Sequence, residues 1–262
     1  LLPAGAALWW LQIAATAGLF ALLQNCPRPR TAFALAWVFA LAWLMGAVGW
    51  IYTSLHVYGG LAAPLALAAL AALAGFLAFY FGAAGAFFRH FSNKWRVKPA
   101  WAALLFAAFW LMAELARNSW LTGFPWGASA YAQIDGPLAF IAPYGGVYGI
   151  ACIATLLACS CAMVLQAAWQ QGLRLNRQGL HRLTRPLLGL AACLGVLALA
   201  PRLLPAVQSQ PSHAPMTVDL LQGHISQGEK FNFDTGVPQA LAWYKQALLA
   251  SDADLIITPE TA

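Results

Sequence analysis

Charged residues are scarce in this 262-residue sequence, since eight acidic and fourteen basic side chains make up only 8% of it. A soluble domain carries about 25% charged residues. Because 61% of this chain is hydrophobic, too few polar groups exist to cover the surface of a soluble globule, and part of the chain must be solvated by lipid. The sequence therefore predicts an integral membrane protein.

Cysteine is also scarce, with five residues in the whole chain. So few cysteines exclude a disulfide-stabilised scaffold. Their spacing matches no metal site, so we expect neither a metal ion nor a cofactor. Four of them, Cys152, Cys159, Cys161 and Cys193, fall within apolar runs, where cysteine acts as a small apolar residue.

Long apolar runs, by contrast, are abundant. A helix needs about 20 apolar residues to cross a hydrocarbon core of roughly 30 Å. We expect six spans, at about 8–24, 32–52, 61–88, 100–116, 146–169 and 187–204. The predicted fold is thus a polytopic α-helical membrane domain over residues 1–204, followed by a linker at 205–215 and the start of a different domain at 216–262.

Basic residues are concentrated in alternate connections between these spans. Ten of the fourteen follow the first, third and fifth spans, namely Arg28, Arg30, Arg89, Lys94, Arg96, Lys98, Arg174, Arg177, Arg182 and Arg185. The positive-inside rule places these connections in the cytoplasm and the segment after the sixth span outside. The same count puts the N-terminus outside, so we expect a preceding span that this sequence lacks. Nucleic-acid binding is not expected, because three short loops share the basic residues.

The connection after the fourth span is long and aromatic. It runs from Arg117 to Gly145, and its Trp126 and Tyr131 fit either an aromatic belt at the headgroups or a re-entrant loop that shapes a lipid entrance. Glu114 precedes Arg117 by three positions, so both lie on one helical face. An acid within a membrane is costly unless it is paired. We therefore expect a structural ion pair that anchors the loop, with a direct role for Glu114 as the alternative.

Residues 216–262 have a different pattern. An apolar run at 216–221, an amphipathic stretch at about 235–249 and a second apolar run at 254–258 predict a strand, a helix and a parallel strand. Two strands bury too little to be complete, so we expect the beginning of a larger α/β domain. Glu260 follows the second strand directly, where functional side chains of such sheets gather. General-base chemistry and helix capping both remain open for it.

Several motifs occur in order along the chain and together indicate a family. They are Trp50-Ile-Tyr-x-Ser, Trp110-x-x-x-Glu114-x-x-Arg117, Thr122-Gly-Phe-Pro-Trp126, Tyr131-x-Gln133-Ile-Asp-Gly-Pro137, Leu221-Gln-Gly-x-Ile225-x-Gln227 and Pro259-Glu260. The sequence resembles bacterial apolipoprotein N-acyltransferase, a membrane member of the nitrilase superfamily, shortened at both ends.

The resemblance implies an enzyme of the bacterial cytoplasmic (inner) membrane with eight spans and a periplasmic nitrilase-like domain. Such an enzyme moves an acyl chain from phosphatidylethanolamine, through a cysteine thioester, to the N-terminal amine of diacylglyceryl-cysteine lipoproteins. Its partners are a phospholipid donor, a diacylated lipoprotein acceptor and the bilayer. A membrane-bound amidase of the same superfamily, and a transporter, are the competing hypotheses.

The resemblance also implies a catalytic triad of Glu, Lys and Cys. Only the Glu has a match here, at Glu260, as general base. We expect the Lys and Cys beyond Ala262, so the fragment alone should be inactive. The family usually has Trp where this sequence has Phe231. The resemblance implies substrate contacts for Phe231, Trp126 and Tyr131, with a packing role as the alternative for Phe231.

Overall fold

The computed structural model describes residues 8–171, 184, 186–192, 194–195, 197–199, 215–226, 228–230 and 232–259. The chain divides into two units, each described by itself below. The first comprises Leu1–Thr53 and Ala62–Ala206, and the second comprises Ser54–Leu61 and Val207–Ala262. The predicted linker at 205–215 falls almost entirely outside the described residues.

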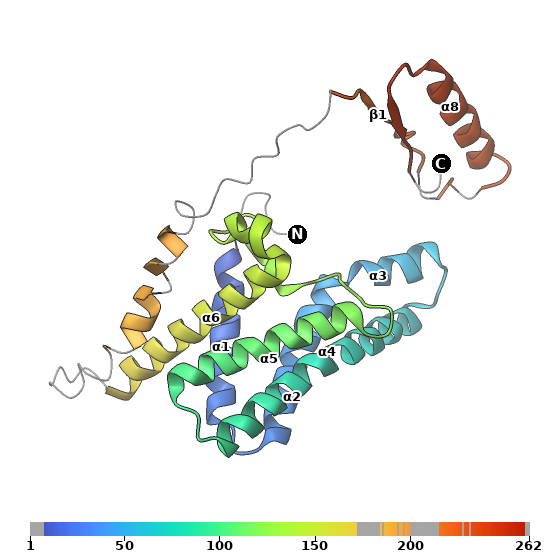
Figure 1. The fold of residues 1–262 in the computed structure, drawn as a ribbon. Helices are drawn as coiled ribbons and strands as arrows, with labels where there is room; N and C mark the ends of the chain where they lie inside the picture. The colour runs from blue at the N-terminus through green and yellow to red at the C-terminus, as the bar shows by residue number, and fades with distance from the viewer. Residues whose placement is uncertain are drawn as a thin grey trace. The chain divides into compact units, whose positions relative to one another are not determined.

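The first unit is a bundle of helices (Figure 1). Its elements are α1 (Trp9–Asn25), α2 (Pro29–Ala47), α3 (Trp50–Thr53), α4 (Ala63–Lys94), α5 (Pro99–Ser119), the 3₁₀ turns η2 (Ser129–Gln133) and η3 (Ala139–Ile141), and α6 (Ala142–Gln171). A π-helical turn, η1 (Ser54–Tyr58), belongs to the second unit. Proline at the start of α2, α4 and α5 suits the first helical turn, where no N–H partner is lost.

Three helices of the described segments are long and apolar enough to cross a membrane: Pro29–Ala47, Ala63–Lys94 and Ala139–Gln170. The membrane class is thereby confirmed. The helices α1 and α5, of 17 and 21 residues, lie over two further predicted spans, and the sixth, at 187–204, falls partly outside the described residues. The count of six spans therefore stays a prediction.

One predicted span has the wrong boundary. Residues 32–52 were expected as one helix, but α2 ends at Ala47 and α3 begins at Trp50. Gly46 lies in the last turn of α2, and Gly49 lies in the break itself. Glycine lowers helix stability by about 1 kcal/mol relative to alanine, so the break has a local cause. The aromatic segment from Trp50 is thus separate from the spanning helix.

Small residues let α2 and α4 pack closely. Every fourth residue of α2 is buried, in the series Ala32, Ala36, Ala40 and Leu44. A Cβ added to Gly85 of α4 would lie 2.7 Å from the Cβ of Ala36 and 2.9 Å from the carbonyl oxygen of Ala32. Backbones approach this closely in membranes because small side chains gain van der Waals contact there.

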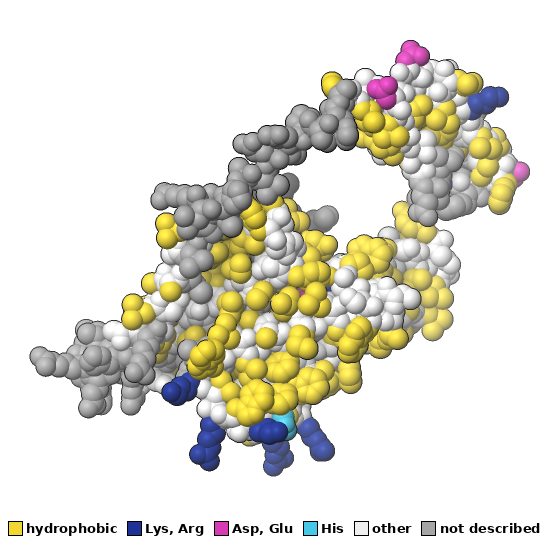
Figure 2. Space-filling model, in the orientation of Figure 1, with side chains coloured by type: hydrophobic (Ala, Val, Ile, Leu, Met, Phe, Trp, Pro, Cys, Tyr) yellow, Lys and Arg dark blue, Asp and Glu magenta, His cyan; other side chains and the backbone are white. Residues whose placement is uncertain are grey.

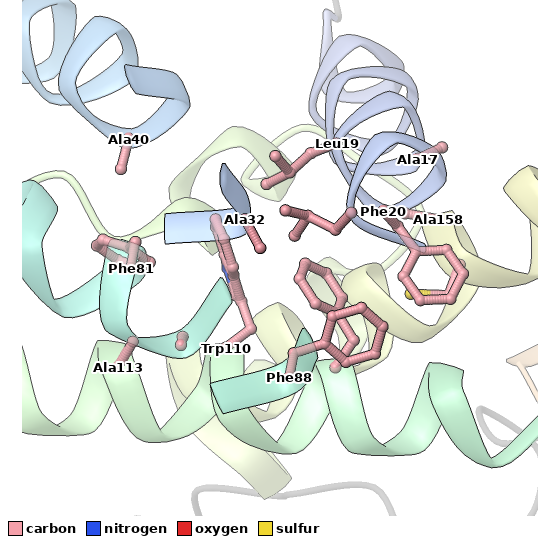
Figure 3. Packing of buried hydrophobic residues seen from close by; sticks show 14 of the residues in the cluster. Ala17, Leu19, Phe20, Ala32, Ala40, Phe81, Phe88, Trp110, Ala113 and Ala158 are labelled. Carbon is pink, nitrogen blue, oxygen red and sulfur yellow. The ribbon is translucent and has the colours of Figure 1, made fainter. Parts of the chain in front are cut away.

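Aromatic side chains fill the centre of the bundle (Figure 3). The ring of Phe20 in α1 lies 5.8 Å from Phe88 in α4 and 5.4 Å from Phe106 in α5, between centroids. Trp110 lies 4.8 Å from Phe81 in the same way. These rings come from three helices, so the aromatic cluster fixes the relative rotation of α1, α4 and α5.

Basic side chains gather at one end of the helical unit, and hydrophobic side chains cover most of the visible remainder (Figure 2). The connections α1–α2 and α4–α5 meet at this end (Figure 1). The helices beside these connections are joined here, because Arg89 Nη1 in α4 donates to the carbonyl oxygen of Gln24 in α1 at 2.9 Å. The charge pattern of these two connections therefore corresponds to one end of the bundle. The connection at 174–185 lies outside the described residues except for Thr184.

The second unit contains the predicted strand, helix and parallel strand. Its elements are β1 (Val218–Leu220), α8 (Gly236–Ala250) and β2 (Leu255–Ile257). The strands pair in parallel, with Val218 opposite Leu255 and Leu220 opposite Ile257. The helix α8 lies beside the two strands (Figure 1). The order and type of these elements are confirmed, while both strands are shorter than the apolar runs that predicted them.

A side-chain clamp closes the start of the sheet. The carboxylate of Asp254 accepts the N–H of Thr217 at 2.8 Å and its hydroxyl at 2.9 Å, and Asp254 N–H donates back to the Thr217 hydroxyl at 3.0 Å. Hydrogen bonds from the backbone and side chain of Thr217 hold the pKa of Asp254 below its usual range. The clamp sets the register of the two strands at their first pair.

Candidate functional site

Glu114 and Arg117 form a buried ion pair near the end of α5. Arg117 Nη2 lies 3.1 Å from Glu114 Oε2, and both side chains are fully shielded from solvent. The pair forms at the predicted helical spacing of three residues. A charge this deeply buried is tolerated only when it is paired and hydrogen-bonded. The other contacts of the two side chains therefore decide what the pair does.

Those other contacts all run to the loop that follows α5. The guanidinium donates through Nη1 to the carbonyl oxygens of Phe124 and Trp126, the latter at 2.8 Å. Glu114 Oε1 accepts the N–H of Ser129 at 3.0 Å. The backbone adds a bond from Phe124 N–H to the carbonyl oxygen of Arg117, at 2.9 Å. The pair thus gathers three backbone groups of the loop, which is the geometry expected of an anchor.

The loop's tight turn carries an unusual backbone. Leu121, Thr122 and Gly123 have φ values of 53°, 73° and 79°, a left-handed region that only glycine visits readily. A Cβ on Gly123 would lie 1.9 Å from the carbonyl oxygen of Asn118. Such conformations persist only where the surroundings determine them. Here the bonds of Arg117 to the carbonyl oxygens of Phe124 and Trp126 hold the chain directly after the turn.

The anchored loop presents aromatic side chains at the surface. Trp120, Trp126 and Tyr131 are all exposed. The Trp126 ring nevertheless meets Trp50 edge to face, with centroids 6.4 Å apart, and Phe124 at 5.1 Å. The structure therefore places two of the residues expected to contact substrate, Trp126 and Tyr131, on one ordered and partly apolar loop.

Gln133 joins this loop to α1, a contact that the sequence did not predict. Its side chain is fully buried, and Nε2 donates to Gln12 Oε1 at 2.7 Å and to the carbonyl oxygen of Trp9 at 3.1 Å. A Cβ on Gly136 would lie 2.5 Å from Gln133 Oε1. Gln133 and Gly136 both belong to the motif from Tyr131 to Pro137. Their close packing explains why this motif has a residue without a side chain at position 136.

The second unit contains a cleft at the carboxyl ends of its strands. Its volume is about 440 Å³, and its lining residues are Gln222, Gly223, His224, Ile225, Lys230, Tyr244 and Pro259. The Gly223 N–H donates to the Tyr244 hydroxyl at 3.2 Å. A Cβ on Gly223 would lie 3.1 Å from Trp243, so this position has little room for a side chain. Ligands of open α/β sheets bind at this edge.

Two of the predicted site residues, Glu260 and Phe231, lie outside the described residues. Their immediate neighbours along the chain, Pro259 and Lys230, line the cleft. The sequence pattern did not single out Lys230 or Tyr244. The only available signals were that Lys230 adjoins a motif position and that Tyr244 falls on the amphipathic helix.

Within the described segments, no group of three or more His, Cys, Asp or Glu residues is placed to hold a metal ion. The cysteines at positions 26, 152, 159 and 161, which the structure describes, form no disulfide with one another. The chemistry that these segments offer is therefore polar recognition in the cleft and an ordered aromatic loop, with Glu260 directly after the cleft in sequence.

Comparisons of this chain with known proteins all identify the same family. A family profile described as the apolipoprotein N-acyltransferase N-terminal domain matches residues 2–160. An apolipoprotein N-acyltransferase of Verminephrobacter eiseniae (strain EF01-2) is 44% identical over 272 residues, which cover 98% of this chain and 47% of that protein. Proteins of the same name are 38% identical in Ralstonia nicotianae (97% and 45% covered) and 34% identical in Azotobacter vinelandii (97% and 47% covered).

This chain therefore spans about half the length of the curated relatives that it matches. The similarity extends through both units, because 97–98% of the chain is covered in these alignments. The resemblance drawn from the motifs is confirmed, and the chain belongs to the apolipoprotein N-acyltransferase family.

Proposed function

We propose that this chain is the N-terminal part of a phospholipid:apolipoprotein N-acyltransferase of the bacterial inner membrane. One observation carries the proposal. The cleft at the carboxyl ends of β1 and β2 is lined in part by Pro259, which directly precedes in sequence the glutamate that matches the family's general base. In this proposal the helical unit carries six of the spans, and the strand–helix–strand unit begins a nitrilase-like domain on the periplasmic side.

The chemistry assigns Glu260 the role of general base. Glu260 accepts the thiol proton of a cysteine, which we expect in the part of the longer relatives that this chain does not cover. The thiolate attacks the ester carbonyl of the phospholipid, a thioester forms, and the lysophospholipid leaves with a proton. The amine of the diacylated lipoprotein then attacks the thioester, so an amide forms and the thiol is released.

The aromatic loop serves lipid entry in this scheme. Tryptophan and tyrosine side chains favour the headgroup region of a bilayer, and Trp126 and Tyr131 are both exposed on the loop. The buried pair of Glu114 and Arg117 fixes the loop's backbone. Trp126 and Tyr131 would thus contact the acyl donor as it approaches, while Glu114 acts structurally.

The decisive experiment uses the gene's full-length product. The purified protein receives phosphatidylethanolamine and a diacylated lipopeptide, and mass spectrometry detects the triacylated product. Glu260→Gln should abolish the acyl-enzyme thioester, because glutamine cannot accept the thiol proton. Glu229→Gln is the matched control, since the Glu229 carboxylate bonds the Thr235 hydroxyl at 2.6 Å and takes no part in the chemistry.

Two outcomes would count against the proposal. A folded full-length protein that yields no triacylated lipopeptide would refute the acyltransferase, and hydrolysis of a simple amide by the same preparation would favour a membrane-bound amidase. Persistence of the thioester in Glu260→Gln would remove Glu260 from the role of base.

A further inference from the structure

The cleft of the second unit has hydrogen-bond donors that the proposed acyl transfer does not use. Lys230, His224 and Gln222 all line it. Lysine offers three N–H donors and a charge, the imidazole offers at least one donor, and the amide offers two. The described lining residues include no carboxylate. A cleft lined by these hydrogen-bond donors and a positive charge is suited to bind an anion.

Two local features support a recognition site. His224 has φ 53°, a left-handed conformation that is costly for a non-glycine residue and typical of functional positions. The acidic neighbour of Lys230 in sequence, Glu229, already accepts a hydrogen bond from Thr235 at 2.6 Å. The carboxylate of Glu229 therefore has a partner on the chain other than the Lys230 ammonium.

The size and place of the cleft narrow the choice of anion. Its volume of about 440 Å³ is within the range of small-molecule sites, roughly 300–1,000 Å³. It lies at the edge of parallel strands where ligands bind. A phosphate group, with several acceptor oxygens, matches a lysine that has further hydrogen-bond donors near it.

We propose that this cleft binds the phosphate group of the phospholipid donor, with Lys230 as the charged contact and His224 as a further hydrogen-bond donor. This inference rests on the proposed function, which brings a phospholipid to the same unit. It assigns the headgroup to the side of the cleft formed by residues 222–225 and Lys230. The ester would then extend toward the carboxyl end of β2, where Glu260 follows.

Steady-state kinetics on the full-length enzyme test the assignment. Lys230→Gln should raise KM for phosphatidylethanolamine about fivefold, the size of one partly exposed charge-assisted hydrogen bond. Its kcat and its KM for the lipopeptide should stay within about twofold of the parent values. Lys245→Gln is the control, because Lys245 lies on α8 away from the lining of this cleft.

Binding measured without turnover separates this inference from the proposed function. Phosphorus NMR of sn-glycero-3-phosphoethanolamine should show line broadening with the full-length protein, and Lys230→Gln or His224→Ala should reduce it. This result in a protein that transfers no acyl chain would support the phosphate site while refuting the acyltransferase.

Three results would overturn the inference. One is a fall in kcat at saturating phospholipid with KM unchanged, which would assign Lys230 to the reaction itself. Another is equal behaviour of Lys230→Gln and Lys245→Gln. The third is binding of inorganic phosphate as tight as that of the diester, which would indicate a site for free phosphate instead of a lipid.

Discussion

The buried ion pair in α5 should contribute a measurable part of the protein's stability, because it holds the backbone of the aromatic loop. Glu114→Gln keeps the shape of the side chain but removes the charge that balances Arg117. The glutamine oxygen can still accept the Ser129 N–H, which Glu114 accepts at 3.0 Å. The guanidinium also keeps its bonds to the carbonyl oxygens of Phe124 and Trp126. The substitution therefore removes the charge and the acceptor for Arg117 Nη2, because the glutamine NH2 takes the place of Oε2, and it leaves the bonds to the loop in place.

The expected loss of stability is large because both side chains are fully buried. Removing one partner of a buried pair costs about 3–5 kcal/mol. Glu114→Gln should lower the free energy of unfolding by about 3 kcal/mol, at the lower end of this range, since Arg117 retains neutral partners. Arg117→Met should cost about 5 kcal/mol, because it leaves a buried carboxylate and releases the loop carbonyls as well.

The double variant Glu114→Gln/Arg117→Met completes a thermodynamic cycle. Its cost should be about 5 kcal/mol, well below the sum of the single costs, because neither charge is left alone. Unfolding of the full-length protein in mixed micelles, titrated with a denaturing detergent, measures each free energy. Chymotrypsin cleavage at Trp120 and Trp126 reports separately on the loop and should accelerate in both single variants.

The exposed carboxylate of Glu229 supplies the control, and Glu229→Gln should change stability by less than about 0.5 kcal/mol. The reasoning fails if the costs of the single Glu114 and Arg117 variants simply add, since independent sites do so within about 0.5 kcal/mol. Unchanged stability and cleavage in Glu114→Gln, together with lost acyl transfer, would instead favour the direct role for Glu114.

Three further predictions concern the backbone and the sheet. Gly123→Ala should destabilise the protein by at least about 2 kcal/mol, because its φ is 79° and positive φ disfavours alanine. Gly46→Ala is the control, since nothing lies within 4 Å of the added Cβ, and it should be neutral or stabilising in the same unfolding assay. Gly85→Val should separate α2 from α4 and cost about 2 kcal/mol or more, which a disulfide-crosslinking scan between the two helices would detect. The lowered pKa of Asp254 means that the folded unit favours the charged form, so its stabilisation of the sheet should be present above about pH 4 and be lost as the pH falls further. Hydrogen exchange of the β1 amides, compared with Asp254→Asn at each pH, should converge in acid; a constant difference would contradict the clamp.

The order of the elements was readable from the sequence because it depends on short-range patterns. Apolar runs marked the helices that can cross a membrane, and the two runs around an amphipathic stretch predicted β1, α8 and β2. The spacing between Glu114 and Arg117 also placed both on one helical face. Each inference used residues close together in the chain, where helical or strand periodicity determines the geometry. The charge counts grouped the connections α1–α2 and α4–α5, which lie at one end of the bundle (Figure 1), while the membrane orientation inferred from those counts stays a prediction.

Local pattern failed where tertiary packing or a single residue type decided the outcome. The predicted span at 32–52 overlooked the break at Val48 and Gly49. The contact of Gln133 with Gln12 joins residues 121 positions apart, and no periodicity can reveal it. Lys230 and Tyr244 likewise line one cleft, in a fold where the segment after β1 contacts α8 through the bond from Gly223 N–H to the Tyr244 hydroxyl.

The sequence by itself therefore determined the membrane class, the strand–helix–strand order and the family, because composition, periodicity and ordered motifs are properties of the chain. Only the tertiary structure decided which backbone groups of the loop the buried pair holds, and which donors share the cleft before Glu260. Those arrangements depend on packing between segments distant in sequence. Hydrogen bonds in low-dielectric surroundings then select one geometry, because a buried polar group left without a partner is costly.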